Sequence, residues 1–227
     1  MLNVSEIFKS IDGECNHWGQ GALTTFIRLQ GCNLHCDYCD TKHTQDGLKT
    51  KHLLEVEDIV KIIPPGKVTI TGGEPLLQKE EVTSLISILN YDKHKVSIET
   101  NGSMRIPNSL IGYQNLSWII DYKLHAQDMM NIDNFWNTIS QDWIKFVIET
   151  PDDFQKACDV IESLKAGGCR ARIAFSPVMH DSDLWPAQWL AERIIEKQID
   201  ISLNLQIHKL IWPNKPEGIS LLSRISK

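Results

Sequence analysis

The chain of 227 residues lacks the features that mark several broad classes of protein. No apolar run approaches the roughly 20 residues of a membrane-spanning helix, so we expect no membrane contact. The N-terminus has no basic stretch followed by an apolar run, so we expect no secretion signal and predict a cytoplasmic protein. The net charge is −6, and no basic face shows in the charge order. Because phosphate-backbone binding normally requires such a face, we expect no nucleic-acid partner and favour a small-molecule substrate.

The chain also lacks internal repeats, low-complexity tracts and long linkers. Its length suits one domain, so we predict a single domain over residues 1–227, with 1–22 and 214–227 as additions. Six cysteines are present. In a chain expected to stay inside the cell, they are more typical of ligands and core residues than of disulfides.

Short runs rich in Val, Ile, Thr and aromatic residues alternate with helical patterns. The predicted strands span residues 24–30, 67–71, 95–100, 116–121, 143–149, 171–176 and 201–206. The predicted helices span residues 54–63, 79–89, 152–165 and 185–197. Such alternation implies parallel strands covered by helices. These units are too few for a closed eight-stranded barrel, so we predict an α/β fold with an incomplete, open barrel of about six parallel strands. In such folds the site lies at the C-terminal ends of the strands.

Three of the cysteines, Cys32, Cys36 and Cys39, stand at C-x3-C-x2-C spacing directly after the first predicted strand. Soft thiolates this close together select zinc or an iron–sulfur cluster. A structural zinc site typically takes four ligands from two cysteine pairs, and no second pair follows here. A four-iron cluster held by three thiolates instead keeps one iron open to a small molecule. A zinc knuckle completed by His35 or His43, or three unrelated thiols, are the alternatives.

Polar motifs follow several predicted strands, and each has an ordinary reading beside a functional one. TGGEP at 71–75 suits a turn, but its glycines also let a ligand approach the backbone while Glu74 accepts from an ammonium. ETNG at 99–102 suits an Asn-Gly turn, and Asp121 with Lys123 suits a surface ion pair of little energy. Further motifs are DGEC at 12–15, FIRLQGC at 26–32, CDT at 39–41, SPVM at 176–179 and QIHK at 206–209.

The cysteine spacing resembles that of the radical S-adenosylmethionine (SAM) enzymes. Together the motifs, from residue 5 to about 213, resemble those of the 7-carboxy-7-deazaguanine synthase family. The resemblance implies the open barrel, a [4Fe-4S] cluster, SAM and Mg²⁺. It implies conversion of 6-carboxy-5,6,7,8-tetrahydropterin into 7-carboxy-7-deazaguanine, a queuosine precursor, with loss of ammonia through a radical derived from SAM. A homodimer and an electron donor such as flavodoxin or ferredoxin are implied as partners.

The same resemblance implies a set of ligands. Cys32, Cys36 and Cys39 would hold the cluster, and the Thr41 hydroxyl would bind Mg²⁺, which accepts such a weak ligand when waters and substrate oxygens supply the rest. The implied SAM contacts are Tyr38, Cys39, Asp40, Gly73, Glu74, Glu99, Asp121, Tyr122, Lys123, Ser176, Pro177, Val178 and Met179. The implied substrate contacts, with residues 1–22 as the substrate-binding segment, are Ile11, Asp12, Gly13, Glu14, Arg28, Thr71 and His208.

Two of these residues suit the pterin chemically. A guanidinium such as that of Arg28 offers paired donors that match the substrate carboxylate. The carboxylate of Glu14 suits the N–H edge of the pterin ring. The ordinary readings are that Arg28 is a charge satisfied by Glu14 and that His208 is a structural histidine.

Some residues depart from the family pattern. Asp12 stands in place of the usual glutamine, and Cys15 in place of the usual glycine, which leaves the course of this loop open. We expect Cys15 to be structural or a free thiol rather than a fourth cluster ligand, and Cys158 and Cys169 to carry no chemistry. Some relatives end soon after the QIHK motif, whereas here the extension 214–227 follows, with no assigned role.

Two other functions stay open. A glycyl-radical-enzyme activase shares the C-x3-C-x2-C spacing, but it acts on a protein backbone and would not need Glu14, Arg28 and His208. A non-catalytic iron–sulfur or zinc-binding protein would need only the cysteines. Release of 5′-deoxyadenosine only when the pterin is added distinguishes a synthase from an activase. Iron counting after anaerobic reconstitution tests the non-catalytic alternative.

Overall fold

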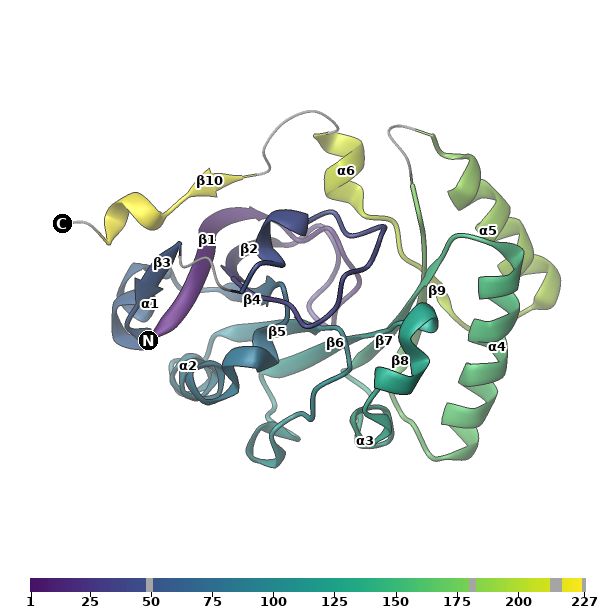
Figure 1. Cartoon of the computed structure of the whole chain (residues 1–227), viewed down its shortest axis with the longest axis horizontal. Helices are drawn as coiled ribbons and strands as arrows, with labels where there is room; N and C mark the ends of the chain where they lie inside the picture. Colours follow the sequence, from purple (N-terminus) through teal and green to yellow (C-terminus); the bar gives the residue numbers. More distant parts are fainter. Residues whose placement is uncertain (48–50, 180–182, 213–217, 226–227) are drawn as a thin grey trace.

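The computed structural model describes residues 1–47, 51–179, 183–212 and 218–225. In this part of the chain, a ten-stranded sheet runs in the order β10-β1-β2-β4-β5-β6-β7-β8-β9, and β3 also pairs with β1 (Figure 1). The strands are β1 (Leu2–Ile11), β2 (Leu23–Leu29), β3 (His52–Leu54), β4 (Lys67–Gly72), β5 (Lys95–Thr100), β6 (Leu116–Tyr122), β7 (Trp143–Ile148), β8 (Arg172–Pro177), β9 (Ser202–Leu203) and β10 (Ile219–Ser220).

The strands from β2 to β9 are parallel, and six of the seven predicted strands lie within one residue of their expected bounds. The exception is the last, predicted over 201–206 and observed only at Ser202–Leu203. The chain leaves the sheet at Asn204, whose side-chain oxygen accepts from the backbone N–H of Cys15 at 2.8 Å. A contact with the N-terminal loop therefore ends this strand early.

The strand β1 was not predicted. It pairs antiparallel with β2 from Val4 to Ile11, and the register shifts between Val4 and Glu6. Because of this shift, buried residues do not alternate regularly along the strand, and the period of two that identifies a strand is lost. Residues 2–11 are therefore part of the sheet.

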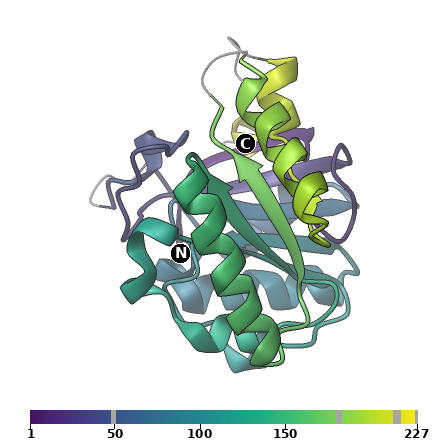
Figure 2. The ribbon, with the colours of Figure 1, turned by 90° about the vertical axis from the view of Figure 1, so that its right-hand side faces the viewer.

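Each of the four predicted helices lies within two residues of its expected bounds, and the described residues form six α-helices in all. They are α1 (Val56–Ile62), α2 (Lys79–Tyr91), α3 (Ile132–Trp136), α4 (Pro151–Ala166), α5 (Trp185–Lys197) and α6 (Ile207–Ile211). The start of α4 is fixed by a capping box between Thr150 and Asp153, with Pro151 in the first turn. Figure 2 shows α4 and α5 on either side of β8. The helices α3 and α6 were not predicted, because five residues are too few to show a helical period.

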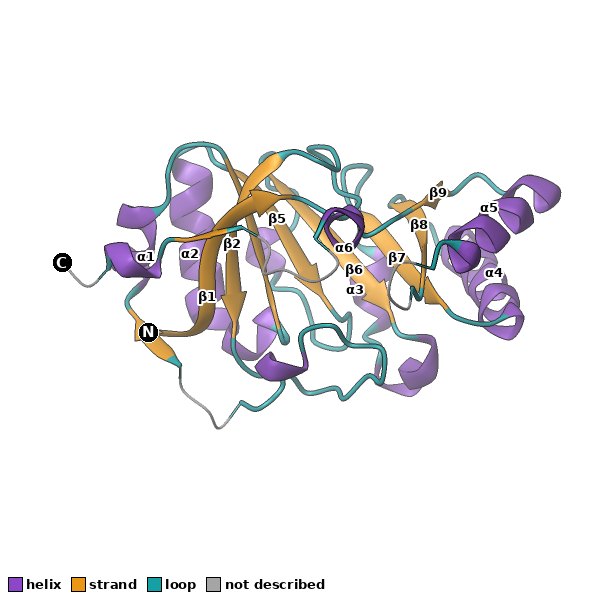
Figure 3. Cartoon of the chain, turned by 90° about the horizontal axis from the view of Figure 1, so that it is seen from above, coloured by secondary structure: helices purple, strands orange, loops and turns teal. Residues whose placement is uncertain are grey.

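The sheet is curved but not closed. Its order begins at β10 and ends at β9, and these two strands do not pair among the described residues. Figure 3 shows α1 and α2 outside the sheet near its β1 end, and α4 and α5 near its β9 end. This arrangement confirms the incomplete, open α/β barrel. Among the described residues, no helix combines the length and apolar character that crossing a bilayer requires.

Candidate active site

A cavity of about 790 Å³ opens at the C-terminal ends of β2 and β4 to β8. This volume lies within the range of small-molecule sites. Except for Ile11, Glu74 and Tyr122, all of the predicted site residues line it. Those that line it are Asp12, Gly13, Glu14, Arg28, Cys32, Cys36, Tyr38, Cys39, Asp40, Thr41, Thr71, Gly73, Glu99, Asp121, Lys123, Ser176, Pro177, Val178, Met179 and His208.

The three clustered cysteines lie on the loop that follows β2, and all of them reach the cavity. Gly31 begins this loop at φ +100°, a conformation that favours glycine, and its N–H donates to the carbonyl of Thr44 at 2.7 Å. The N–H of Cys39 donates to the carbonyl of Cys36 at 3.2 Å, which holds the second half of the loop in a turn. These backbone hydrogen bonds fix the loop in a shape that exposes its three cysteines to the same cavity.

The surroundings of the thiols are those of metal ligands. Burial raises the pKa of Cys32 and of Cys36, so a bound metal is needed to keep them as thiolates. The sulfur of Cys32 accepts from the backbone N–H of Leu34 at 3.5 Å and from the Asn101 amide at 3.8 Å, and such hydrogen bonds tune cluster sulfurs.

The side chain of Glu74 does not line the cavity in this structure. It is fully buried, and its carboxylate accepts hydrogen bonds from the backbone N–H of Leu76 at 2.9 Å, the hydroxyl of Thr100 at 2.8 Å and the backbone N–H of Asn101 at 2.7 Å. Glu74 thus ties the end of β4 to the end of β5. That its carboxylate also accepts from a ligand ammonium stays a prediction.

The glycines of the same motif bring β4 against the cysteine loop. A Cβ atom on Gly73 would lie 1.9 Å from the carbonyl oxygen of Gly31, and one on Gly72 would lie 2.2 Å from that of Leu29. The N–H of Gly73 donates to the carbonyl of Leu29 at 3.1 Å. Both glycines are thus required by backbone packing, and Gly73 lines the cavity as well.

Two other predicted contacts do not line the cavity. Asp121 and Lys123 line it, whereas Tyr122 between them lies on the opposite face, because side chains alternate along a strand. The ring of Tyr122 stacks on Phe146 with centroids 5.3 Å apart, and the predicted contact of Tyr122 with SAM stays a prediction. Ile11 ends β1, and its predicted main-chain contact with substrate stays a prediction.

Arg28 projects from β2 into the cavity. Its Nε donates to Glu6 of the neighbouring β1 at 3.0 Å, and its guanidinium carbon lies 5.5 Å from the centre of the Phe8 ring. The ordinary reading that Glu14 satisfies this charge is therefore wrong. The guanidinium is held by β1 and is only 8% exposed, so its orientation is fixed before any ligand binds.

A chain of buried charges crosses the floor of the cavity. Lys145 of β7 forms an ion pair with Glu14 and lies 3.1 Å from Asp121, which pairs in turn with Lys123 at 2.6 Å. Burial opposes the charge of Asp121, but the two ammonium groups outweigh it and lower the pKa of this carboxyl. Gln206 donates to the other oxygen of Glu14 at 2.7 Å. Sequence reasoning missed Lys145, although a lone charge inside the apolar run WIKFVI was a usable signal.

The loop after β1 is held by buried contacts. Asp12 forms an ion pair with Lys67 and accepts from the hydroxyl of Thr69 at 3.0 Å, so the departure from the family's glutamine is matched by a buried cation. A Cβ atom on Gly13 would lie 1.9 Å from Nδ1 of His208, so the imidazole packs directly on this glycine. His208 therefore links the C-terminal QIHK motif to the N-terminal segment.

Cys15 is a buried free thiol, as expected. It clusters with Ile119, Trp143 and Ala174, and burial raises its pKa. Nothing in its surroundings suggests a metal ligand. Cys158 and Cys169 are also free, and each packs partly buried against the core.

The end of the cysteine loop meets the C-terminal part of the chain. The carboxylate of Asp40 lies 3.0 Å from the ammonium of Lys209 on α6. The Thr41 hydroxyl lies 3.6 Å from the sulfur of Cys39 and faces the same cavity. The ring of Tyr38 stands edge-on to His125, with centroids 5.5 Å apart. The loop is thus supported from two sides.

Glu99 is half-buried at the end of β5, where it lines the cavity and accepts from the Thr71 hydroxyl at 2.7 Å. Burial, followed by the negative charges of Glu14 and Asp12, raises the pKa of Glu99 from 4.5 to about 8. The folded chain therefore holds a proton here that the unfolded chain releases at lower pH.

The raised pKa of Glu99 predicts that the stability of the protein depends on pH. Because the folded state binds it more tightly, the contribution of Glu99 to the free energy of unfolding falls as the pH rises from about 4.5 to about 8. For one group the slope is at most about 1.4 kcal/mol per pH unit. We expect Glu99→Gln to lack this contribution, so wild type should lose stability relative to the variant across that window. Urea unfolding at a series of pH values measures the difference, and a constant difference would contradict the assignment.

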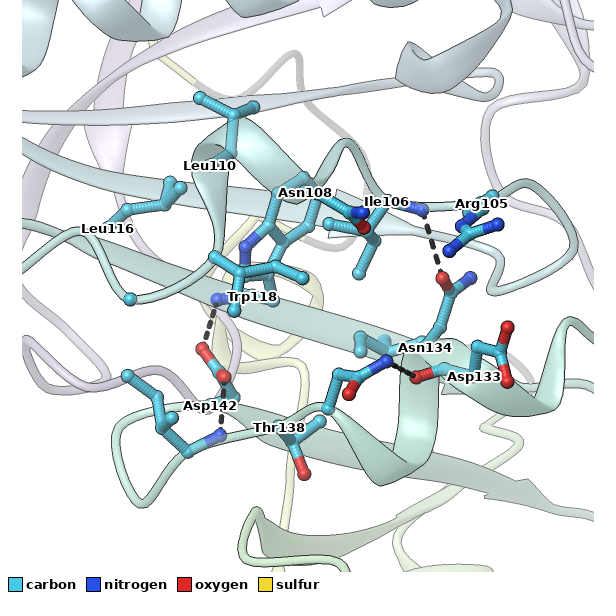
Figure 4. A pocket seen from close by; sticks show the side chains of 15 residues that line it. Arg105, Ile106, Asn108, Leu110, Leu116, Trp118, Asp133, Asn134, Thr138 and Asp142 are labelled. Carbon is cyan, nitrogen blue, oxygen red and sulfur yellow. Dashed lines mark hydrogen bonds between the residues drawn. The ribbon is translucent and has the colours of Figure 1, made fainter.

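A second cavity, of about 20 Å³, lies away from the predicted site residues (Figure 4). Asp142 forms part of its wall and accepts from the backbone N–H groups of Ile139 and Trp118, each at 2.9 Å. Its volume suits about one water molecule. The larger cavity is therefore the candidate active site.

Comparisons with known proteins identify the family of the chain. Residues 26–192 match the model of the radical SAM superfamily. The chain is 39% identical over 220 residues to the 7-carboxy-7-deazaguanine synthase of Clostridium acetobutylicum, covering 93% of this chain and 97% of that protein. It is 37% identical over 211 residues to the enzyme of the same name from Methanospirillum hungatei, covering 92% and 85%. The crystal structure of QueE from Escherichia coli has the same fold, with a TM-score of 0.70, 22% identity and coverage of 90% and 93%. The chain therefore belongs to the radical SAM superfamily and, within it, to the 7-carboxy-7-deazaguanine synthase family.

Proposed function

We propose that the chain converts 6-carboxy-5,6,7,8-tetrahydropterin into 7-carboxy-7-deazaguanine with release of ammonia. The observation that carries the proposal is that one cavity holds both the cysteine loop and a buried Arg28–Glu14 constellation. A fixed guanidinium suits the substrate carboxylate. A carboxylate suits the N–H edge of the pterin. The same cavity thus offers a cofactor wall and a substrate wall.

The cofactor wall begins at the cysteine loop. Cys32, Cys36 and Cys39 would hold a [4Fe-4S] cluster, and Thr41 would bind Mg²⁺ beside it. When bound, the cluster and SAM supply one electron and a carbon-centred radical that removes a hydrogen atom from the pterin. The proposed SAM contacts among the cavity residues are Tyr38, Asp40, Gly73, Glu99, Asp121, Lys123, Ser176, Pro177, Val178 and Met179.

The substrate wall is formed by the loop after β1 and by α6, which come from the N-terminal and C-terminal parts of the chain. Asp12, Gly13 and Glu14 approach from the N-terminal loop, and His208 from α6, with its ring against Gly13. Because these segments pack on each other, they hold the pterin in a fixed orientation and keep water from the reacting carbon. A reactive radical attacks whatever lies nearest, so orientation is the main task of the protein.

The decisive test is an anaerobic assay with the reconstituted protein, the pterin, SAM and Mg²⁺. We expect the ultraviolet absorbance of a 7-deazapurine to appear only in the complete mixture. Release of 5′-deoxyadenosine without added pterin, but with a glycyl-radical protein, would indicate an activase. A preparation that binds zinc and no iron would overturn the enzyme proposal.

Arg28→Ala should weaken substrate use without removing the cluster. Loss of charged hydrogen bonds worth roughly 1.5–3 kcal/mol predicts a KM for the pterin about 10- to 100-fold higher. Iron content should stay at the wild-type level. Arg172→Ala is the matched control. Arg172 is the first residue of β8 and so lies at the N-terminal ends of the parallel strands, whereas the cavity lies at their C-terminal ends. An unchanged KM in the Arg28 variant would contradict its carboxylate role.

The proposed reaction also needs a source of single electrons, for which flavodoxin or ferredoxin is the expected partner. We further propose a homodimer. Reduction of the cluster by each purified donor, followed by spectroscopy, tests the first. Sedimentation of the reconstituted protein tests the second.

A further inference from the structure

Lys145 has no role in the reaction as proposed so far, although it lies at the centre of the cavity floor. It stands in β7 between Ile144 and Phe146, both fully buried, and is itself only 5% exposed. A buried ammonium costs much free energy unless it is paired and hydrogen-bonded. An apolar residue would fit this strand more cheaply, so the position calls for an explanation.

The partners of Lys145 come from both walls of the cavity. On one side its ammonium pairs with Glu14, which belongs to the substrate wall. On the other side it lies 3.1 Å from Asp121, which belongs to the cofactor wall. Asp121 is also its register partner on the neighbouring strand β6, so the backbone ladder fixes this second contact. A rigid strand thus carries one cation that holds two carboxylates at a set separation.

In both carboxylates, the oxygen that does not face Lys145 also accepts a hydrogen bond. Glu14 accepts from Gln206 at 2.7 Å, and Asp121 accepts from Lys123 at 2.6 Å. The connected chain therefore runs from the C-terminal QIHK motif, through Lys145, to the cofactor wall. Without Lys145, Lys123 would be the only described side chain that forms an ion pair with either buried acid, Glu14 or Asp121, and like charges would push the two acids apart.

We propose that Lys145 is a positioning residue, which sets the distance between the pterin held at Glu14 and the SAM held near Asp121. This inference rests on the proposed function. Lys145 holds no reacting atom itself and acts through the two carboxylates. Hydrogen transfer between two bound molecules depends steeply on their separation, and a displacement of about 1 Å can cost roughly 100-fold in rate.

The test compares Lys145→Met, which keeps an unbranched side chain one atom shorter and without charge, with Lys145→Arg, which keeps the charge. In Lys145→Met we expect full iron content, a fall of about 100-fold in kcat/KM for the pterin, and 5′-deoxyadenosine released in excess over product. Lys145→Arg should restore most of the product formed per SAM consumed. Lys156→Met, which removes a surface ion pair of 2.7 Å on α4, should match wild type.

A merely structural role would lower the thermal midpoint without changing the ratio of product to 5′-deoxyadenosine. Wild-type kinetics and an unchanged ratio in a folded Lys145→Met would overturn the inference while leaving the proposed function intact. Failure of the wild type to make product would overturn both. If Lys145→Met does not fold, the double variant Glu14→Gln with Lys145→Met removes the unpaired buried charge. A wild-type ratio of product to 5′-deoxyadenosine in that double variant would also overturn the inference.

Discussion

Cys36→Ala is expected to lose both its iron–sulfur absorbance and all turnover. The variant keeps the thiols of Cys32 and Cys39 on the loop, and two thiolates cannot hold a four-iron cluster with one open corner. Burial raises the pKa of Cys32, which favours its protonated form, so we expect the two remaining thiols not to retain iron by themselves. Iron per chain and visible absorbance after anaerobic reconstitution measure the loss.

Cys158→Ala serves as the matched control. This thiol is half-buried on α4, far along the chain from the cysteine loop, and should leave iron content and turnover at wild-type levels. Retained turnover in Cys36→Ala would refute the ligand assignment. Equal loss in both variants would instead indicate a general sensitivity to cysteine replacement.

Gly73→Ala is expected to damage the site through its backbone. The added Cβ would lie 1.9 Å from the carbonyl oxygen of Gly31, so either β4 or the cysteine loop must move. Gly31 cannot easily yield, because its positive φ and its bond to Thr44 fix the start of the loop. Overpacking of this kind costs about 1–3 kcal/mol, and we expect iron content and SAM affinity to fall as well.

The control for this variant is Gly47→Ala. Its Cβ would lie 3.5 Å from the Cα of the same Gly31, an ordinary van der Waals distance. Chemical unfolding of both apoproteins and iron counting after reconstitution compare the two. Wild-type stability and iron content in Gly73→Ala would show that the two loops are not packed as described.

The parallel strands and the main helices were predictable because their signals are local. Runs of β-branched residues such as those of β4 and β5 need no knowledge of their neighbours, and the cysteine spacing is a property of one short loop. The early end of β9 and the presence of β1 were not predictable in this way. The first depends on a contact between Asn204 and Cys15 far apart in the sequence, and the second on a register shift after Val4.

The environment of some site residues was not predictable from local signals. The period of two along β6 places the side chain of Tyr122 on the face opposite Asp121. The sequence cannot show that the protein supplies three donors to the carboxylate of Glu74. The lone charge of Lys145 within the apolar run of β7 was a signal in the sequence, but its partners Glu14 and Asp121 are known only from the structure.

The outer edge of β1 is paired by two short strands, β3 along Leu2–Val4 and β10 at Phe8 and Lys9. Between them, the carbonyl of Ile7 accepts from the N–H of Leu221. An uncovered edge strand invites other chains to add to it and aggregate. Two pieces of the same polypeptide, one of them beyond residue 213, occupy those main-chain groups here. The strand β10 of the C-terminal extension therefore helps to prevent another copy of the chain from adding to this edge of the sheet.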